Sequence, residues 1–359
     1  MAELFMNILI IRLSALGDVI HALSVVSPLK KYFPGCKITW VIEEEAADLL
    51  KSYPGIDRVI VSRRKRWLRQ MKGGQMLKAF RQVSAFVRTL RSVEYDLVLD
   101  FQGLFKSGII SFLSRGKRKI GYKNAREGST FFYSEKAPAT DFNDHAIKRH
   151  QVISKHLGIN NDEISYEPLF NINDEKAVDN LLNSSGVDRR KMLVTVHPAA
   201  TWKTKIWPKE KVVELCDLLV NEFSCQVVLV GSYAEEPFLK DMVSRAKNEI
   251  KNLAGKTKLS ELACLIAKSD LLVSTDSGPM HIACASETPV VAIMGPTAPW
   301  RTGPFGNDCS VVRHELSCSP CFKRTECPLK HHKCMEEISV EEVFKTCCNW
   351  LKQNDRNIK

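Results

Sequence analysis

The 359-residue sequence lacks several signals that would place it in other classes of protein. No apolar run reaches the roughly 20 residues that a membrane-spanning helix needs. The first apolar segment follows neither a basic region nor a small-residue cleavage site, so it does not read as a secretory signal. Internal repeats and low-complexity segments are also missing. We therefore expect a protein that stays in the cytoplasm.

The composition is that of a globular protein with a basic balance. At 44% hydrophobic and 26% charged residues, a chain of this length can bury two ordinary cores. The polar stretch 160–174 is the best linker, which gives domains at residues 1–170 and 171–359. A formal net charge of +11 and a pI near 9.0 indicate an anionic partner, which can be nucleic acid, an anionic membrane surface or a phosphorylated substrate.

Apolar runs that read as strands alternate with segments of helical character. The predicted strands are residues 6–13, 37–42, 58–61 and 97–100, and then 193–196, 226–231, 271–275 and 289–294. Helices are expected to begin at Val19, Ala46, Gln75 and Leu104, and at Pro208, Glu236, Leu259 and Met280. This β–α–β order, which occurs twice, is typical of parallel sheets covered by helices on both faces. The sequence therefore predicts an α/β fold with two Rossmann-like domains.

The turn after the apolar run 271–275 has the features of a phosphate site. Asp276, Ser277 and Gly278 break the run and lead into a helix, whose first N–H groups have no partners within the helix. Such a helix start binds anionic groups readily. The alternative is that Ser277 or Asp276 only caps the helix, a common role for these residue types.

A second turn of this kind lies near the N-terminus. Residues 14–18 connect the first predicted strand to a helix, and Gly17 permits close approach of a ligand or an unusual backbone angle. Asp18 stands at the helix start, where the helix dipole favours an ionised carboxylate. It suits either a helix cap or a general base. The glycine triplet of dinucleotide-binding turns is missing. The two turns are expected to face each other across a cleft between the domains, since ligands bind at strand ends in such sheets.

Cysteine is unusually frequent, and several of the 12 residues lie near the C-terminus. The run Cys318, Cys321, Cys327 and Cys334, with two histidines nearby, has enough soft ligands for zinc or for an iron–sulfur cluster. Reduced, buried thiols are the alternative. No metal is assigned to the catalytic mechanism.

Five segments together resemble glycosyltransferase family 9, the lipopolysaccharide heptosyltransferases. They are residues 11–18, 100–107, 205–208, 276–281 and 295–297. Their order and spacing carry the resemblance, which extends over most of the chain and is nearest to the heptosyltransferase I members.

The resemblance implies a GT-B architecture, with the acceptor domain first and the nucleotide-sugar domain second. Members transfer heptose from ADP-heptose to the inner-core keto-sugar of lipid A, with inversion at the anomeric carbon and no required metal or other cofactor. It also implies work at the cytoplasmic face of the inner membrane, as a peripheral protein on an anionic lipid surface.

Individual roles follow from the resemblance as well. Asp18 matches the proposed general base, Lys205 a diphosphate contact and Glu235 a ribose contact. The further donor-side candidates are Ser14, Gly17, Thr201, Lys203, Asp276, Ser277, Gly278, Pro279 and His281. The loop 197–207 is one residue longer than in the best-known relatives, so Thr201, Lys203 and Lys205 all stay open as the donor contact. The alternatives are a solvated lysine at 205, an acid at a helix start at 235 and a histidine bound to a local carbonyl at 281.

A basic segment at residues 63–69 is the remaining candidate site. Arg63, Arg64 and Arg66, with Arg126 further along, match or neighbour acceptor-facing arginines of the family. Guanidinium groups fit phosphates and carboxylates, and Trp67 within the run also favours an anionic membrane surface. A merely solvated face is the alternative. Nucleic acid is not expected, because no nucleic-acid-binding module is present.

Two other functions remain open on the sequence alone. One is a non-catalytic protein that binds a nucleotide-sugar or a lipid, which intact Asp18 and Lys205 argue against. The other is a nucleotide-sugar epimerase, which would not need a basic acceptor patch.

Overall fold

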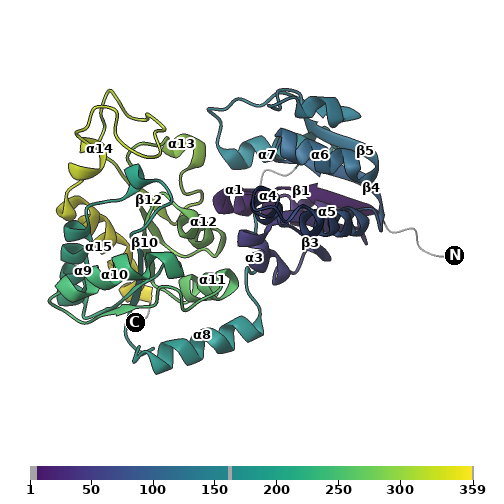
Figure 1. Ribbon diagram of the computed structural model, residues 1–359. Helices are drawn as coiled ribbons and strands as arrows, with labels where there is room; N and C mark the ends of the chain where they lie inside the picture. Colours follow the sequence, from purple (N-terminus) through teal and green to yellow (C-terminus); the bar gives the residue numbers. More distant parts are fainter. Residues whose placement is uncertain (1–5, 161–163, 358–359) are drawn as a thin grey trace. The chain divides into compact units, whose positions relative to one another are not determined.

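A computed structural model describes residues 6–160 and 164–357 (Figure 1). The chain forms two compact units, Met1–Pro168 and Leu169–Lys359. Each contains one six-stranded sheet in which every pair of neighbouring strands is parallel. The predicted α/β fold with two Rossmann-like sheets is thereby confirmed.

The N-terminal unit has the strand order β3-β2-β1-β4-β5-β6. Its strands are β1 (Asn7–Ile11), β2 (Lys37–Glu43), β3 (Arg58–Ser62), β4 (Glu94–Asp100), β5 (Arg115–Tyr122) and β6 (Glu135–Ala137). Its helices are α1 (Leu16–Leu23), α2 (Val26–Tyr32), η1 (Glu44–Ala46), α3 (Ala47–Lys51), α4 (Arg64–Lys72), α5 (Met76–Leu90), α6 (Phe105–Leu113), η2 (Ser129–Phe132) and α7 (Ala146–His156). The order reverses between β1 and β4, the place where ligands bind in doubly wound sheets.

The C-terminal unit repeats this topology with the order β12-β11-β10-β7-β8-β9. Its strands are β7 (Leu193–His197), β8 (Gln226–Leu229), β9 (Ile250–Asn252), β10 (Leu271–Thr275), β11 (Val290–Ile293) and β12 (Cys309–Val312). Its helices are α8 (Ile172–Ser184), η3 (Lys203–Lys205), α9 (Lys209–Phe223), η4 (Tyr233–Glu235), α10 (Glu236–Arg245), α11 (Leu259–Ala267), α12 (Gly278–Ala285), α13 (Pro299–Thr302), α14 (Lys333–Glu336) and α15 (Val340–Asn357). Here the order reverses between β7 and β10.

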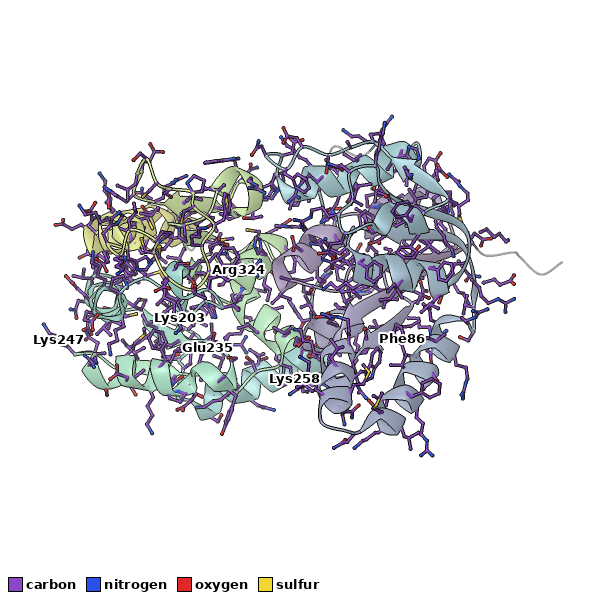
Figure 2. All side chains as sticks on the ribbon, turned by 45° about the horizontal axis from the view of Figure 1, so that its top comes forward. Phe86, Lys203, Glu235, Lys247, Lys258 and Arg324 are labelled. Carbon is purple, nitrogen blue, oxygen red and sulfur yellow. The ribbon has the colours of Figure 1, made fainter. Side chains whose placement is uncertain are left out.

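The central strands are buried on both faces, which explains their nearly continuous apolar sequence. In the N-terminal unit, Trp67 of α4, Phe86 of α5 and Ile110 of α6 join one apolar cluster with residues of β1, β2, β3 and β4. These three helices therefore cover the same face of the sheet (Figure 1), and Figure 2 labels Phe86 on this layer. A second cluster fills the C-terminal unit around β7, β10, α9 and α15.

The structure differs from the sequence-based expectations at three places. The single helix expected to begin at Val19 is in fact two helices, α1 and α2, because Pro28 has no N–H to donate to the Ser24 carbonyl and its ring would clash there. Strand β5 was not predicted, because half of it is cationic. Its cations pair with neighbouring strands, for example Lys117 with Asp96 at 2.8 Å.

The third difference is the extent of the linker. Helix α8 begins at Ile172, inside the stretch 160–174, and the Asn171 side chain caps it by accepting hydrogen bonds from the N–H groups of Asn173 and Asp174. An asparagine at this position favours a helix start over continued coil. Residues 161–163 of the predicted linker lie outside the described part of the chain.

Candidate active site

Asp18 lies at the carboxyl edge of the N-terminal sheet, in the first turn of α1 directly after β1. Its Oδ2 accepts an ion-paired hydrogen bond from Arg12 Nη2 at 2.6 Å. Arg12 is buried, and its Nη1 donates to the carbonyl of Phe101 at 2.6 Å. The Asp18 side chain keeps 32% of its surface exposed, against 8% for Arg12. The pair therefore fixes the carboxylate and leaves it accessible.

The surroundings of Asp18 favour its ionised form. Burial is the largest single effect and raises the pKa of Asp18. The charge of Arg12, together with smaller effects that include the Ala15 N–H and Arg149, outweighs it, so the pKa lies below its usual value. Burial, followed by the charge of Arg12, holds the pKa of His150 well below its usual value. The imidazole is therefore neutral near pH 7, and its Nδ1 lies 3.0 Å from the Tyr122 hydroxyl.

The loop between β1 and α1 is held by the segment 100–107. Gln102 Oε1 accepts hydrogen bonds from the N–H groups of Leu13 at 3.0 Å and Ser14 at 3.2 Å. Lys106 Nζ donates to Ser14 Oγ at 3.2 Å. Gly17, by contrast, lies inside α1 without a left-handed φ angle, so the expectation of an unusual backbone angle there was wrong.

A buried carboxylate, Glu43, gathers cations beside this loop. It lies at the end of β2, with Arg64 at 3.3 Å, Lys65 at 3.4 Å and Lys106 at 3.5 Å. Lys65 also pairs with Glu45 at 2.7 Å, so two carboxylates stand among three cations. The site keeps a net positive charge, which suits an anionic ligand. Sequence reasoning missed both residues, although Glu43 directly follows the predicted strand 37–42 and Lys106 stands in the first turn of the helix predicted from Leu104.

The other predicted acceptor arginines differ in their surroundings. Arg63 pairs with Glu44 at 3.1 Å. Arg66 is exposed and forms no ion pair with any residue that the structure describes. The guanidinium of Arg126 lies over the Phe142 ring, 5.6 Å from its centroid. Thus Arg64 contacts the Glu43 cluster directly, whereas Arg66 is free to meet a partner in solution.

Lys205 and Asp276 form the centre of the candidate site in the C-terminal unit. Lys205 Nζ lies 2.7 Å from Asp276 Oδ2, and their side chains are 14% and 5% exposed. Asp276 also accepts a hydrogen bond from Thr297 Oγ1 at 2.5 Å. The solvated-lysine alternative is therefore wrong. Asp276 thus holds the ammonium group of Lys205 in place. A direct contact between Asp276 and a phosphate is unfavourable, because both carry negative charge.

Two cations contact the ring of Trp202, in the loop that carries Lys205. Lys205 Nζ is 4.4 Å and the Arg324 guanidinium 4.9 Å from the centroid of the Trp202 ring. The cysteine-rich segment braces the same loop, because Thr204 Oγ1 donates to the carbonyl of Lys323 at 2.5 Å. Arg324, labelled in Figure 2, thus brings a second cation near Lys205 that sequence reasoning missed.

The turn after β10 leads directly into α12, with Ser277 at the N-cap position and Gly278 and Pro279 in the first turn. No side chain caps α12 in the described structure, so the capping alternative was wrong. Ser277 Oγ instead lies 3.0 Å from His197 Nδ1. Burial lowers the pKa of His197 to about 4, although Glu235 acts in the opposite direction, so this imidazole is neutral near pH 7. His281 is buried in the same helix.

The remaining donor-side candidates have different surroundings. Glu235 Oε2 accepts hydrogen bonds from Ser232, from its N–H at 2.7 Å and its hydroxyl at 2.9 Å, as a helix-start acid does. Thr201 and Lys203 are exposed, and Figure 2 labels Lys203 and Glu235. Ser14 and Gly17 belong to the N-terminal unit, next to Asp18. The assignment of Ser14, Gly17 and the other candidates of this paragraph to donor binding stays a prediction.

The cysteines do not form a metal centre in the described residues. All twelve are free thiols, and no three His, Cys, Asp or Glu side chains there are placed to share a metal ion. The zinc and iron–sulfur interpretations of Cys318, Cys321, Cys327 and Cys334 are therefore not supported by the geometry. Among all the residues that the structure describes, no helix is long and apolar enough to cross a membrane.

Two Rossmann-like sheets in one chain, each with charged groups at its switch point, form the GT-B architecture, which many glycosyltransferases have. Comparison with known families makes this specific. Residues 83–332 match the model of glycosyltransferase family 9 (heptosyltransferase), and the chain belongs to that family. The protein is a glycosyltransferase enzyme.

Individual relatives cover nearly the whole chain. It is 30% identical to a lipopolysaccharide core heptosyltransferase of Haemophilus influenzae over 349 residues, 94% of this chain and 95% of the relative. Identity is also 30% to lipopolysaccharide heptosyltransferase 1 of Escherichia coli K12, with coverage of 86% and 93%. The E. coli heptosyltransferase WaaC, solved with ADP, superimposes with a TM-score of 0.77 at 25% identity, covering 96% of this chain and all of WaaC.

Proposed function

We propose that this enzyme transfers heptose from ADP-heptose to the inner-core keto-sugar of lipid A, inverting the anomeric centre. The likeness to lipopolysaccharide heptosyltransferases over most of their length supports this donor and acceptor. The observation that carries the proposal is the Arg12–Asp18 pair, which holds an accessible, ionised carboxylate at the switch point of the first sheet.

Asp18 is proposed as the general base. Its carboxylate takes the proton of the acceptor hydroxyl while that oxygen attacks the anomeric carbon. The bond between the anomeric carbon and the diphosphate oxygen breaks at the opposite face of the sugar, and the electron pair leaves with ADP. Arg12 positions Asp18 in this step, because it keeps the carboxylate ionised and fixes its orientation through the anchor to the Phe101 carbonyl.

Lys205 is proposed to stabilise the leaving ADP. Negative charge grows on the diphosphate as the bond breaks, and a cation held in place lowers the barrier more than a mobile one does. The uncapped N-terminus of α12 offers backbone N–H donors to the same group. These groups supply the positive charge that the step needs, so we propose that no metal is required. Arg324 is a further candidate, because it shares the Trp202 ring with Lys205.

The N-terminal unit is proposed to bind the acceptor, and the C-terminal unit the donor. The net positive cluster around Glu43, together with Arg63, Arg66 and Arg126, suits a lipid that carries phosphates and carboxylated sugars. Because that acceptor resides in a bilayer, we propose that the enzyme works at the cytoplasmic face of the inner membrane as a peripheral protein.

The test is release of ADP from ADP-heptose, measured with and without lipid A carrying its keto-sugars. We expect release that depends on the acceptor, together with a product heavier by one heptose in mass spectrometry. Protein that binds ADP but gives no acceptor-dependent release would contradict the assigned acceptor. Release of ADP and free heptose without acceptor would contradict transfer itself.

A further inference from the structure

Helix α6 turns a row of apolar side chains outward. Phe105, Ile109 and Phe112 are 49%, 36% and 64% exposed, at the i, i+4 and i+7 spacing that places them on one side of the helix. The opposite side is already satisfied, because Ile110 belongs to the core cluster of this unit. A surface helix normally presents polar residues to solvent, so this outward stripe is not explained by folding.

The 3-10 helix η2 extends the stripe and holds it rigid. Phe132 packs between the outward residues, with ring centroids 5.8 Å from Phe105 and 5.9 Å from Phe112. Gly108 permits this approach, since a Cβ atom there would lie 2.4 Å from Phe132 Cδ2. Phe131, beside it, is 89% exposed. Phe105, Ile109, Phe112 and Phe131 together form what we call the aromatic face.

The chain around the aromatic face is strongly cationic. Residues 63–93 contain ten Lys and Arg and no acidic residue, and residues 101–126 contain seven and none. The first stretch includes α4 and α5, which cover the same side of the sheet as α6. Among the described residues, no ion pair involves Lys78 or Arg81 of α5. The same helix exposes Met76, Leu77 and Phe80. Carboxylates of this chain pair with seven of these seventeen cations, but among the described residues not with Lys78 or Arg81. The apolar side chains of α5 thus stand beside cations that have no ion pair.

We propose that the outer surface of α5, α6 and η2 docks on an anionic lipid bilayer, with the aromatic face inserted at the level of the headgroups. The inference rests on the proposed function, because it names how the enzyme reaches a membrane-embedded acceptor. Aromatic side chains favour the bilayer interface, and each nearby Lys or Arg adds attraction to anionic headgroups.

The positive charge of this surface favours an anionic bilayer over a second copy of this chain as its partner. Two copies meeting through this surface would bring the unpaired cations of α5, Lys78 and Arg81, against their own copies, which is unfavourable. An anionic bilayer supplies the opposite charge and also removes the phenylalanines from water. The surface leads to the candidate base as well, since Lys106, next to Phe105, donates to Ser14 in the loop before Asp18. An acceptor headgroup at the membrane would therefore lie near that loop.

The test is sedimentation of the full-length enzyme with vesicles of phosphatidylcholine containing 30% phosphatidylglycerol, roughly the charge density of an anionic leaflet. The double variant Phe112→Ser/Phe131→Ser should lower the partition coefficient about tenfold or more, since burying one such side chain is worth at least a factor of ten. Ile172→Ser removes an equally exposed apolar side chain of the C-terminal unit and should have no effect. Lys78→Gln/Arg81→Gln should weaken binding to these vesicles and leave the weak binding to pure phosphatidylcholine unchanged.

Two readouts separate this inference from the proposed function. Transfer to acceptor dispersed in detergent should be the same in the double variant and the wild type, whereas transfer to acceptor in vesicles should fall with binding. A wild type that binds vesicles but transfers no heptose would contradict the proposed function alone. Wild-type binding by the double variant would overturn the inference. So would sedimentation equilibrium showing a dimer that the substitutions dissociate, because the face would then join two copies.

Discussion

Replacing Arg12 with methionine should change the pH dependence of transfer. The guanidinium lies 2.6 Å from Asp18 and opposes the effect of burial on that carboxyl group. Two unit charges about 4 Å apart interact by about 4 kcal/mol at an effective dielectric constant of 20, and by about 1 kcal/mol in water. Because Asp18 is a third exposed, the lower half of that range applies. At 1.36 kcal/mol per pKa unit, the pKa of Asp18 should rise by about 1 to 2.

The higher pKa of Asp18 should shift the acid limb of the pH–rate profile for kcat/KM. A general base works only when it is deprotonated, so kcat/KM of the wild type should stay flat as pH falls until the lowered pKa of Asp18 is reached. In Arg12→Met the fall should begin about 1 to 2 pH units higher. Arg12→Lys keeps the charge and should retain the wild-type limb, although it loses the anchor to the Phe101 carbonyl. An acid limb that does not move in folded Arg12→Met would refute the role given to this pair.

Stability should change in a related way. The lowered pKa of Asp18 means that ionisation stabilises the folded state above the unfolded pKa near 3.9, and that this contribution is lost as pH falls through the folded value. In Arg12→Met this stabilisation by the ionised Asp18 is missing at neutral pH. The Phe101 carbonyl also loses the hydrogen bond that Arg12 Nη1 donates to it. We expect about 1 to 3 kcal/mol less stability at pH 7 by denaturant unfolding, and a smaller difference from wild type near pH 3.

Three further variants address the other assignments. Asp18→Asn should lower kcat about a hundredfold to ten-thousandfold while ADP binding measured by calorimetry stays unchanged, and near-normal turnover would rule out the general base. Lys205→Ala should both weaken ADP binding and slow transfer, because the diphosphate is present in ground and transition states alike, and unchanged values for both would move the contact to another residue of the loop. The triple change of Arg63, Arg64 and Arg66 to Gln should raise the acceptor KM but not the donor KM. The increase should shrink as salt is added, because salt screens exposed charges. Unaltered acceptor kinetics at low salt would show that the segment is only a solvated face.

Much of the fold could be predicted because buried parallel strands leave a strong pattern. Apolar runs such as 271–275 gave the central strands to within a few residues, and the turns after them gave Asp18 and Asp276. Short or polar elements escaped. Strands β6 and β9 have only three residues each, too few to show a period, and the cationic half of β5 is stabilised by pairing that is not local in sequence.

The contacts around the candidate base escaped for a different reason. Glu43, Gln102 and Lys106 meet the loop before Asp18 across up to 92 residues of sequence. No local sequence pattern predicts contacts between residues so far apart in the sequence. Strand order does encode them, because β2 and β4 both flank β1, and the residues that follow all three strands must meet at one edge. A prediction that assumed the doubly wound order would have placed Gln102 and Glu43 beside the loop.

The two switch points use the same pairing in opposite senses. In the N-terminal unit the cation is the buried partner, so Arg12 serves Asp18 and the carboxylate is presented for chemistry. In the C-terminal unit the carboxylate is the more buried partner, and Asp276 holds Lys205 while the ammonium group stays nearer to solvent. A base must offer a negative charge to a proton, and a leaving diphosphate must meet a positive one. Which partner is buried therefore sets the sign of charge that each unit offers, and the two signs are those that the proposed base and the proposed diphosphate contact require.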